Sequence, residues 1–208
     1  MNDACRTIDN RRDKRRRAIL DAARDLFLEK GYEATTLGDI VTRSGGSLAT
    51  LYELFGNKPG LLKAMVTERC ASIAEFIDGV ALTDLEPAEA LGEIARRLFD
   101  QLNDPAGIAL FRVIIAEAPR LPELGQQFYE AGPVAGRRIM AEYLARQTAR
   151  GALAVDDPEA AAVFFFHMLL GERQLRLLCG LPVAEDEREL DRHIGGAVAS
   201  FMRLYAKP

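Results

Sequence analysis

Residues 36–58 read TLGDIVTRSGGSLATLYELFGNK, and they contain the start and stop signals of two short helices. Thr36 can cap the first helix, and Asp39, three residues further on, can reach back to it in a variant of the capping box. The glycine pair that begins at Gly45 predicts the end of that helix, because glycine adopts the left-handed backbone of a C-terminal cap at little steric cost. Ser47 can then cap a second short helix.

Each of these expected helices has one apolar stripe and is otherwise polar, which is the pattern of a helix with one buried face. The stripes consist of Leu37, Ile40 and Val41 in the first helix and of Leu51, Leu54 and Phe55 in the second. Two short helices around a glycine turn form a helix-turn-helix unit, whose second helix enters the major groove of DNA. The sequence therefore predicts a DNA-binding element.

A longer amphipathic helix is expected just before this unit, from Lys14 to Lys30, with Gly31 as its stop. Its apolar face would pack under the two short helices, so residues 13–60 are predicted to form a three-helix DNA-binding domain. Residues 1–12 are polar, have no apolar period and are expected to be a disordered basic arm.

The net charge of −4 is unevenly distributed along the chain. Residues 6–17 contain seven basic and two acidic residues, whereas residues 56–208 contain 17 basic and 22 acidic ones. Positive charge is therefore concentrated near the helix-turn-helix unit, as contact with phosphates requires. Arg15, Arg16 and Arg17 could reach the phosphates, although a merely solvated cluster is the alternative.

The segment LYELFGNK, from Leu51 to Lys58, is preceded by SGGS and followed shortly by two leucines. This arrangement resembles the DNA-binding end of the TetR (tetracycline-repressor-like) family, and the resemblance covers residues 13–72. Two positions depart from the family pattern. Gly46 replaces the usual apolar turn residue, and Leu48 stands where a lysine or arginine is common.

The resemblance implies roles for the exposed positions of this unit. Thr36, Tyr52 and Lys58 would contact phosphates. Leu48 cannot hydrogen-bond to a base, but it could meet a thymine methyl group in the major groove. The positions at or near base edges would be Ser47, Ala49 and Thr50.

The rest of the chain has helical spacing between proline and glycine breaks, so the sequence predicts an all-α protein of about nine helices. Residues 61–208 would form a ligand-binding and dimerisation domain. The segment 112–124, together with FYEAGP at 128–133, resembles the AefR-like C-terminal domain found in a branch of the TetR family. Pro133 should kink or split a helical pattern over 122–150. The helix over 105–118 is apolar nearly all round and is expected to be central.

Two features of the second domain suggest partners. The apolar excess of helices 158–179 and 185–205 suggests that they pair with their copies in a homodimer, and burial within the monomer is the alternative. The domain would also bind a small apolar or amphipathic ligand. Candidate pocket residues are Phe99, Leu102, Phe111, Arg112, Ile115, Phe128, Phe165 and His167.

Ordinary packing offers an alternative for these pocket candidates, because an apolar stripe at helical spacing needs no ligand to explain it. For His167 the favoured interpretation is a hydrogen-bonded core histidine. Arg112 and Glu117 could form an internal polar pair or could orient a ligand, and the sequence leaves both possibilities open.

Several classes of protein are disfavoured. The chain has no run of about 18 apolar residues and no signal-peptide pattern, so we expect a cytoplasmic protein without a membrane span. Cys5, Cys70 and Cys179 lack metal-ligand spacing, which predicts no metal and no cofactor. Reduced thiols are the favoured interpretation, with redox sensing at Cys5 as the alternative.

The sequence thus predicts a ligand-responsive transcriptional repressor that binds double-stranded DNA at a near-palindromic operator as a homodimer. An activator of the same family is an alternative. An enzyme on a helical scaffold is a second alternative, but the chain has no phosphate-binding glycine loop, no zinc-binding histidine pair and no nucleophile motif. The prediction is therefore that the protein is not an enzyme.

Overall fold

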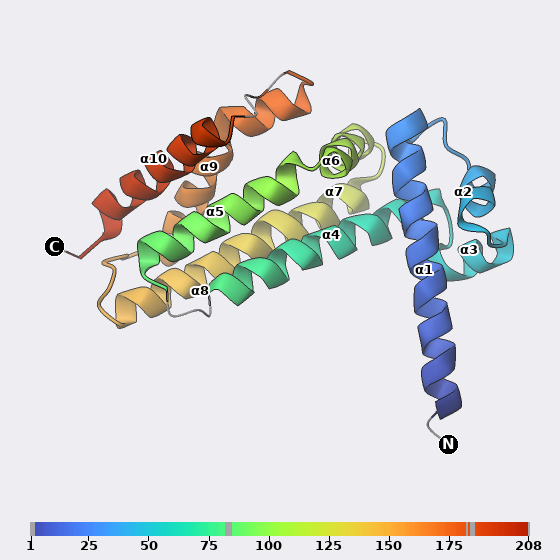
Figure 1. The fold of residues 1–208 in the computed structure, drawn as a ribbon, viewed down its shortest axis with the longest axis horizontal. Helices are drawn as coiled ribbons and strands as arrows, with labels where there is room; N and C mark the ends of the chain where they lie inside the picture. Colours follow the sequence, from blue (N-terminus) through green and yellow to red (C-terminus); the bar gives the residue numbers. More distant parts are fainter. Residues whose placement is uncertain (1–2, 82–84, 182, 184–185, 208) are drawn as a thin grey trace. The chain divides into compact units, whose positions relative to one another are not determined.

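The computed structural model describes residues 3–81, 85–181, 183 and 186–207 (Figure 1). Within these ranges it contains ten α-helices and one π-helical segment, η1 (Glu130–Val134), and no strand. The predicted all-α fold is confirmed. Glu185, where the last helix was expected to begin, and the side chain of Cys5 lie outside the described part of the chain.

The chain forms two compact units. The first comprises residues 1–68 and 109–125, and the second comprises residues 69–108 and 126–208. The sequence placed everything after residue 60 in one second domain. In the structure, a later segment of the chain returns to the first unit instead.

The first unit contains α1 (Asp3–Lys30), α2 (Leu37–Ser44), α3 (Leu48–Phe55) and the start of α4 (Lys58–Ala81). Since α1 begins at Asp3, the prediction of disorder up to residue 12 is wrong from that point on. Extending an already packed helix requires no new nucleation, and arginine and lysine are good helix formers. The three helices share a buried core that includes Ile19, Leu20, Ala23, Leu26, Ile40, Leu51 and Phe55.

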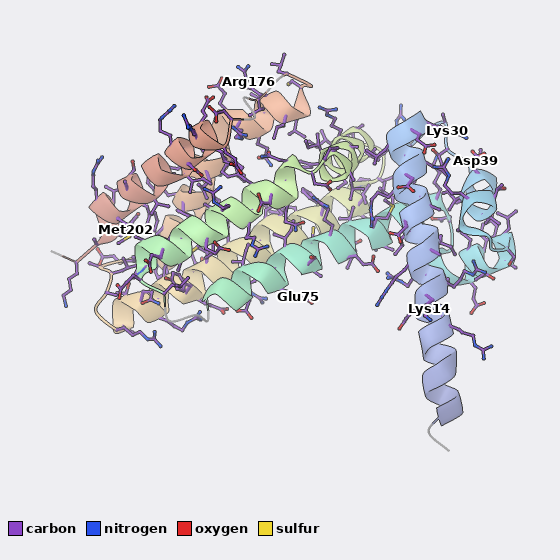
Figure 2. The ribbon with its side chains drawn as sticks, viewed as in Figure 1. Lys14, Lys30, Asp39, Glu75, Arg176 and Met202 are labelled. Atoms are coloured by element: carbon purple, nitrogen blue, oxygen red, sulfur yellow. The ribbon has the colours of Figure 1, made fainter. Side chains whose placement is uncertain are left out.

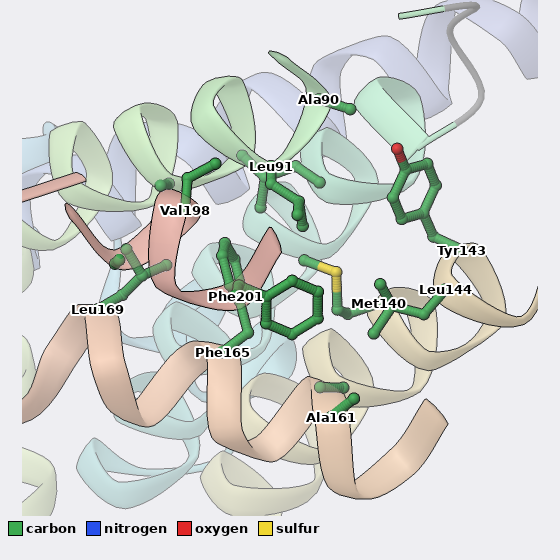
Figure 3. Close-up of a cluster of buried hydrophobic side chains, with 14 of the residues drawn as sticks. Ala90, Leu91, Met140, Tyr143, Leu144, Ala161, Phe165, Leu169, Val198 and Phe201 are labelled. Atoms are coloured by element: carbon green, nitrogen blue, oxygen red, sulfur yellow. The ribbon is translucent and has the colours of Figure 1, made fainter. Parts of the chain in front are cut away.

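The second unit is built around α5 (Pro87–Asn103), α8 (Ala135–Ala149), α9 (Pro158–Leu178) and α10 (Glu187–Tyr205). Helix α9 packs on α8 and on α10, and α10 also packs on α5. Figure 3 shows the apolar side chains that meet between these helices, among them Leu91, Met140, Leu144, Phe165 and Phe201. The rings of Phe165 and Phe201 pack edge to face, with their centroids 5.3 Å apart.

Two breaks interrupt the long helices. The predicted effect of Pro133 is confirmed, because the π-helical η1 contains this proline and separates α7 (Pro122–Tyr129) from α8. The second break, at Gly171 in α9, was not predicted, and its φ of 23° and ψ of −128° are non-helical. Near this kink, Nε2 of His193 lies 2.8 Å from the carbonyl oxygen of Leu169.

Helix α6 (Pro105–Glu117) differs from its predicted central place. Ile114 is buried, but Ile115 is 48 % exposed. Most of its other apolar side chains, including Leu110, Phe111 and Val113, are half-buried. An apolar composition all round a helix therefore did not identify a fully buried one in this chain.

Two leucines of α3 provide a matched test of this packing. Leu51 is 0 % exposed and Leu48 is 45 % exposed. Leu51→Ala should lower the free energy of unfolding by about 2–5 kcal/mol, since it removes buried methyl groups and leaves a cavity. Leu48→Ala should change it by no more than about 0.5 kcal/mol. Urea unfolding followed by circular dichroism measures both, and equal losses would contradict the orientation of α3.

Candidate nucleic-acid interface

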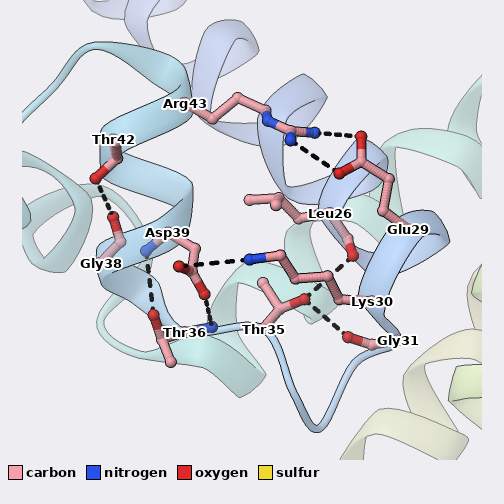
Figure 4. A network of polar contacts seen from close by, with 10 residues as sticks. All are labelled: Leu26, Glu29, Lys30, Gly31, Thr35, Thr36, Gly38, Asp39, Thr42 and Arg43. Carbon is pink, nitrogen blue, oxygen red and sulfur yellow. Dashed lines mark hydrogen bonds and ion pairs between the residues drawn. The ribbon is translucent and has the colours of Figure 1, made fainter.

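The capping box at the start of α2 forms as predicted (Figure 4). The backbone N–H of Asp39 donates to the Thr36 hydroxyl at 3.1 Å, and the N–H of Thr36 donates to a carboxylate oxygen of Asp39 at 3.0 Å. The hydrogen bond from the Thr36 backbone, followed by one from the Thr36 side chain, holds the pKa of Asp39 below its ordinary value. The capping box thus uses both the backbone and the side chain of Thr36.

Polar contacts fix α2 against the end of α1. The guanidinium of Arg43 donates two hydrogen bonds to Glu29, at 2.5 and 2.8 Å, and these lower the pKa of Glu29. Lys30 lies 3.6 Å from Asp39 at the same junction (Figures 2 and 4). The buried Thr35 hydroxyl faces the carbonyl oxygens of Leu26 and Gly31, at 3.2 and 2.8 Å. The bond to Leu26 ties the connecting loop to α1.

The turn between the two short helices begins at Gly45, whose φ of 70° and ψ of 33° are left-handed. Its N–H donates to the carbonyl of Val41 at 3.0 Å and closes α2. Ser47 then caps α3, because its hydroxyl accepts from the N–H of Thr50 at 3.1 Å. The local signals in the sequence therefore produce the expected helix-turn-helix geometry.

Helix α3 presents an exposed mixed surface that begins beside its buried residues. It buries Leu51 and Phe55, while Leu48 and Tyr52 are 45 % and 53 % exposed. Among the other positions expected near base edges, Ser47 and Ala49 are exposed and Thr50 is half-buried. The Thr50 hydroxyl lies 2.9 Å from that of Ser47, so these two groups are already coupled.

The arginines at positions 15 to 17 do not behave alike. Arg15 donates to the carbonyl oxygen of Ser44 at 3.0 Å. Arg16 forms an ion pair with Glu68, and its guanidinium carbon lies 5.8 Å from the centroid of the Phe55 ring. In contrast, Arg17 is exposed.

The three arginines were predicted to be equivalent, yet two of them contact the protein. Lys14, which is exposed next to them, was not among the predicted contacts (Figure 2). The charge run contained Lys14, so the signal was present. The contacts that distinguish Arg15 and Arg16 join residues far apart in the sequence and could not be identified from it.

Lys58, at the start of α4, is held by its own unit. Its amino group lies 4.3 Å from the centroid of the Tyr32 ring and donates to the carbonyl oxygen of Glu33 at 3.1 Å. Burial lowers the pKa of Lys58, whereas Glu33 and Glu117 act in the opposite direction. Burial, assisted by the same two carboxylates, raises the pKa of Tyr32 to about 12.

The segment 109–125, which belongs to the first unit, contributes two charged residues near Tyr32, Glu33 and Lys58. Arg120, just after α6, lies 3.3 Å from a carboxylate oxygen of Glu33, and the side chain of Glu117 is buried. Of the polar pair considered from the sequence, Arg112 is exposed and only Glu117 is buried. Tyr32, Glu33 and Arg120 had no sequence signal, because the chain brings them together only on folding.

The eight predicted pocket residues do not form one group in the structure. Phe111, Arg112 and Ile115 belong to the first unit, and the others belong to the second. Phe165 is fully buried in the core, whereas His167 is exposed on α9. The interpretation of His167 as a core histidine is therefore wrong. It followed from the apolar neighbours of His167 in the sequence, but one of these on the same side of the helix, Phe164, is itself 41 % exposed.

The remaining second-unit candidates are more enclosed. Phe99 is 1 % exposed, with the guanidinium carbon of Arg173 5.5 Å from its ring centroid and His193 packed against it edge to face. Leu102 and Phe128 are half-buried. Cys70 is buried, which raises the pKa of its thiol, and Cys179 is an exposed free thiol.

The described residues lack two kinds of feature. None of the helices combines the length and apolar character needed to cross a bilayer. No group of described histidine, cysteine, aspartate and glutamate side chains is arranged to hold a metal ion.

Comparison with known proteins agrees with this geometry. Residues 19–65 match the family described as bacterial regulatory proteins of the tetR family, and residues 89–207 match the C-terminal domain of AefR-like transcriptional repressors. The first match falls on the helix-turn-helix unit. The second covers more than half of the chain.

Individual relatives give the same picture. A TetR-family transcriptional regulator from Mesorhizobium loti MAFF303099 has a similar structure, with a TM-score of 0.88 and 30 % identity over 95 % of this chain and 99 % of that one. The flavonoid-responsive regulator FrrA is also 30 % identical, with a TM-score of 0.72 over 93 % of this chain and 98 % of its own.

Among curated proteins, the transcriptional repressor BdcR of Escherichia coli K12 is 26 % identical over 141 residues, which is 66 % of this chain and 70 % of BdcR. The family matches and the solved structures agree with the resemblance found in the sequence. The chain therefore belongs to the TetR family of bacterial transcriptional regulators and carries a C-terminal domain of the AefR-like type.

Proposed function

We propose that this TetR-family regulator is a ligand-responsive repressor that binds a near-palindromic operator as a homodimer. The observation that carries the proposal is that α3 has buried residues that anchor it and exposed residues beside them. Leu51 and Phe55 anchor the helix to its unit, while Leu48 and Tyr52 remain exposed. A short, firmly seated helix with an exposed mixed face is suited to reading base edges in the major groove.

Contacts on both sides of α3 would fix its register on the duplex. We assign phosphate contacts to Thr36, Tyr52 and Lys58, and base-edge positions to Ser47, Leu48, Ala49 and Thr50. The exposed Lys14 and Arg17 of α1 are additional phosphate contacts in this proposal. Phosphate contacts of this kind position a protein on DNA but carry no sequence information directly.

Repression is favoured over activation by two comparisons. The C-terminal family is described as transcriptional repressors, and the relative BdcR is named a repressor. An activator and a repressor differ in where they bind relative to the promoter, and the side chains of the protein do not indicate that position.

Regulators of this family bind DNA and act as dimers. We assign the dimer interface to α9 and α10. Phe164 and Leu175 of α9 are 41 % and 61 % exposed, and Leu204 of α10 is 60 % exposed. Gly195 and Gly196 of α10 are exposed, and an added Cβ at either would meet nothing within 4 Å. Exposed apolar side chains beside a smooth helix surface are suited to burial against a second copy.

A small apolar or amphipathic ligand would bind in the second unit, where Phe99, Leu102 and Phe128 supply apolar surface. The similarity to a regulator named flavonoid-responsive is consistent with a ligand of this chemical kind. Binding would displace α4, and with it Lys58 and the spacing of the two DNA-binding units. The ligand can shift this equilibrium only by its difference in affinity between the two states.

Selection of DNA fragments from the source genome with the purified protein tests the function directly. The retained fragments should share a near-palindrome with half-sites about one helical turn, or slightly more, apart. In a parallel selection, Leu48→Ala should change the preference at one base position of each half-site, since it removes an apolar base contact. An unchanged pattern would exclude Leu48 from base reading. Retention of no fragment, even in dilute buffer, would refute the function.

The phosphate role of Lys58 has its own test. Lys58→Ala should weaken binding to every duplex and reduce the slope of log K against log salt by about 0.9, the value for one phosphate contact. Lys63, exposed on the same helix, is the matched control, and Lys63→Ala should leave the slope unchanged. Equal slopes for wild type and Lys58→Ala would show that Lys58 does not contact DNA.

The dimer assignment predicts the effect of two charges on α9. Phe164→Glu combined with Leu175→Glu should raise the dimer dissociation constant by roughly a hundredfold or more, because two apolar side chains lose their burial. Sedimentation equilibrium measures this constant. Leu28→Glu, at a 44 % exposed leucine of α1, is the control and should have no effect. A double variant that dimerises like wild type would place the interface elsewhere.

A further inference from the structure

The side chain of Arg15 is committed to the turn between α2 and α3. Its Nη1 atom donates to the carbonyl oxygen of Ser44, a residue 29 positions away, at 3.0 Å. Ser44 is the last residue of α2, and the final carbonyls of a helix have no partner within it. A cation at this end also complements the helix dipole. Arg15 therefore acts as a second cap for α2, supplied by α1.

Gly46 provides the space for this contact. A Cβ atom at Gly46 would lie 3.4 Å from Nη1 and 3.6 Å from the guanidinium carbon of Arg15. Gly46 does not have a positive φ, unlike Gly45, so its backbone conformation does not require glycine. A side chain larger than alanine would extend into the guanidinium. Gly46, which replaces the usual apolar turn residue of the family, thus leaves room for the Arg15 side chain.

The turn held in this way leads directly into α3. Gly46 is followed by Ser47, whose hydroxyl caps α3. Arg15 thus anchors the backbone immediately before the first residues of the helix that would face DNA. Arg17, two residues along α1, is exposed and serves as a matched comparison.

We propose that Arg15 is a positioning residue: its guanidinium, seated on Gly46, holds the turn that sets the start of α3, and it acts on DNA recognition through α3 rather than through a phosphate. This inference rests on the proposed DNA-binding function. In this inference Arg15 and Gly46 contribute to sequence specificity, whereas exposed basic residues such as Arg17 provide the electrostatic attraction to DNA.

Arginine-to-lysine variants separate the two roles. A phosphate contact tolerates lysine, which binds phosphate as a point charge, whereas the contact to Ser44 and Gly46 uses the planar guanidinium. The probes are a fragment retained in the genomic selection and a scrambled duplex of the same length and composition. Dissociation constants are measured for both over a range of salt concentrations.

Arg15→Lys should weaken binding to the selected fragment about tenfold, the effect of one charge-assisted hydrogen bond, and should leave the salt slope unchanged. Binding to the scrambled duplex should be nearly unaffected. Arg24→Lys, at an exposed arginine of α1 that is outside the proposed DNA contacts, should resemble wild type on both probes. If Arg15→Lys also resembles wild type while Arg15→Gln lowers the salt slope by about 0.9, Arg15 contacts a phosphate and the proposal is overturned.

Gly46→Val provides an independent test, because its side chain would displace the guanidinium. It should reproduce the loss seen with Arg15→Lys, and the two changes together should cost little more than either alone, as expected for one shared contact. A Gly46→Val protein that binds the selected fragment like wild type overturns the proposal. Should this variant fail to fold, Arg15→Lys decides the question.

Hydrogen exchange tests the turn without DNA. Backbone amides over residues 44–52 should exchange faster in Arg15→Lys than in wild type, and Arg17→Lys should leave them unchanged. Unchanged exchange in Arg15→Lys would show that the guanidinium does not hold the turn. If wild type binds neither duplex, the proposed function fails, and this measurement still decides whether Arg15 positions α3.

Discussion

Helices α2 and α3 are eight residues each, and helices shorter than ~12–15 residues are marginal in water, because their nucleation cost is not recovered by propagation. Their stability must therefore come from packing. Helix α2 packs on α1, which supplies the fully buried Ile19 and Ala23, and α3 packs on α2. The contact of Arg43 with Glu29 and the buried Thr35 add polar links at the junction of α1 and α2. The orientation of the DNA-facing α3 thus depends on how α2 is held on α1.

The basic residues 14–17 of α1 combine two roles that a charge count cannot separate. Arg15 contacts the turn and Arg16 pairs with Glu68 of α4, while Lys14 and Arg17 are exposed. The basic residues therefore contribute to the stability of the first unit as well as to its positive electrostatic potential.

Local signals were sufficient for the helix-turn-helix unit, because the caps at Thr36 and Ser47 and the left-handed Gly45 depend on neighbours within a few residues. Pro133 was equally informative, since proline lacks the backbone N–H that would donate to the carbonyl one turn earlier in the helix. The errors have a different origin. The depth of α6, the exposure of His167 and the partners of Lys58 depend on which helices lie beside them, and these neighbours are distant in sequence. The candidate DNA-facing residues were therefore accessible to sequence reasoning, whereas the polar cluster behind Lys58 was not.

A hydrogen bond beside the bend of α9 at Gly171 indicates the tautomer of a histidine. A carbonyl oxygen only accepts hydrogen bonds, so the Nε2 atom of His193, 2.8 Å from the Leu169 oxygen, must carry a hydrogen. The neutral ring is accordingly the Nε2–H tautomer, with its lone pair on Nδ1. The same ring packs edge to face against Phe99. One imidazole thus links the carbonyl oxygen beside the bend to an aromatic ring of α5.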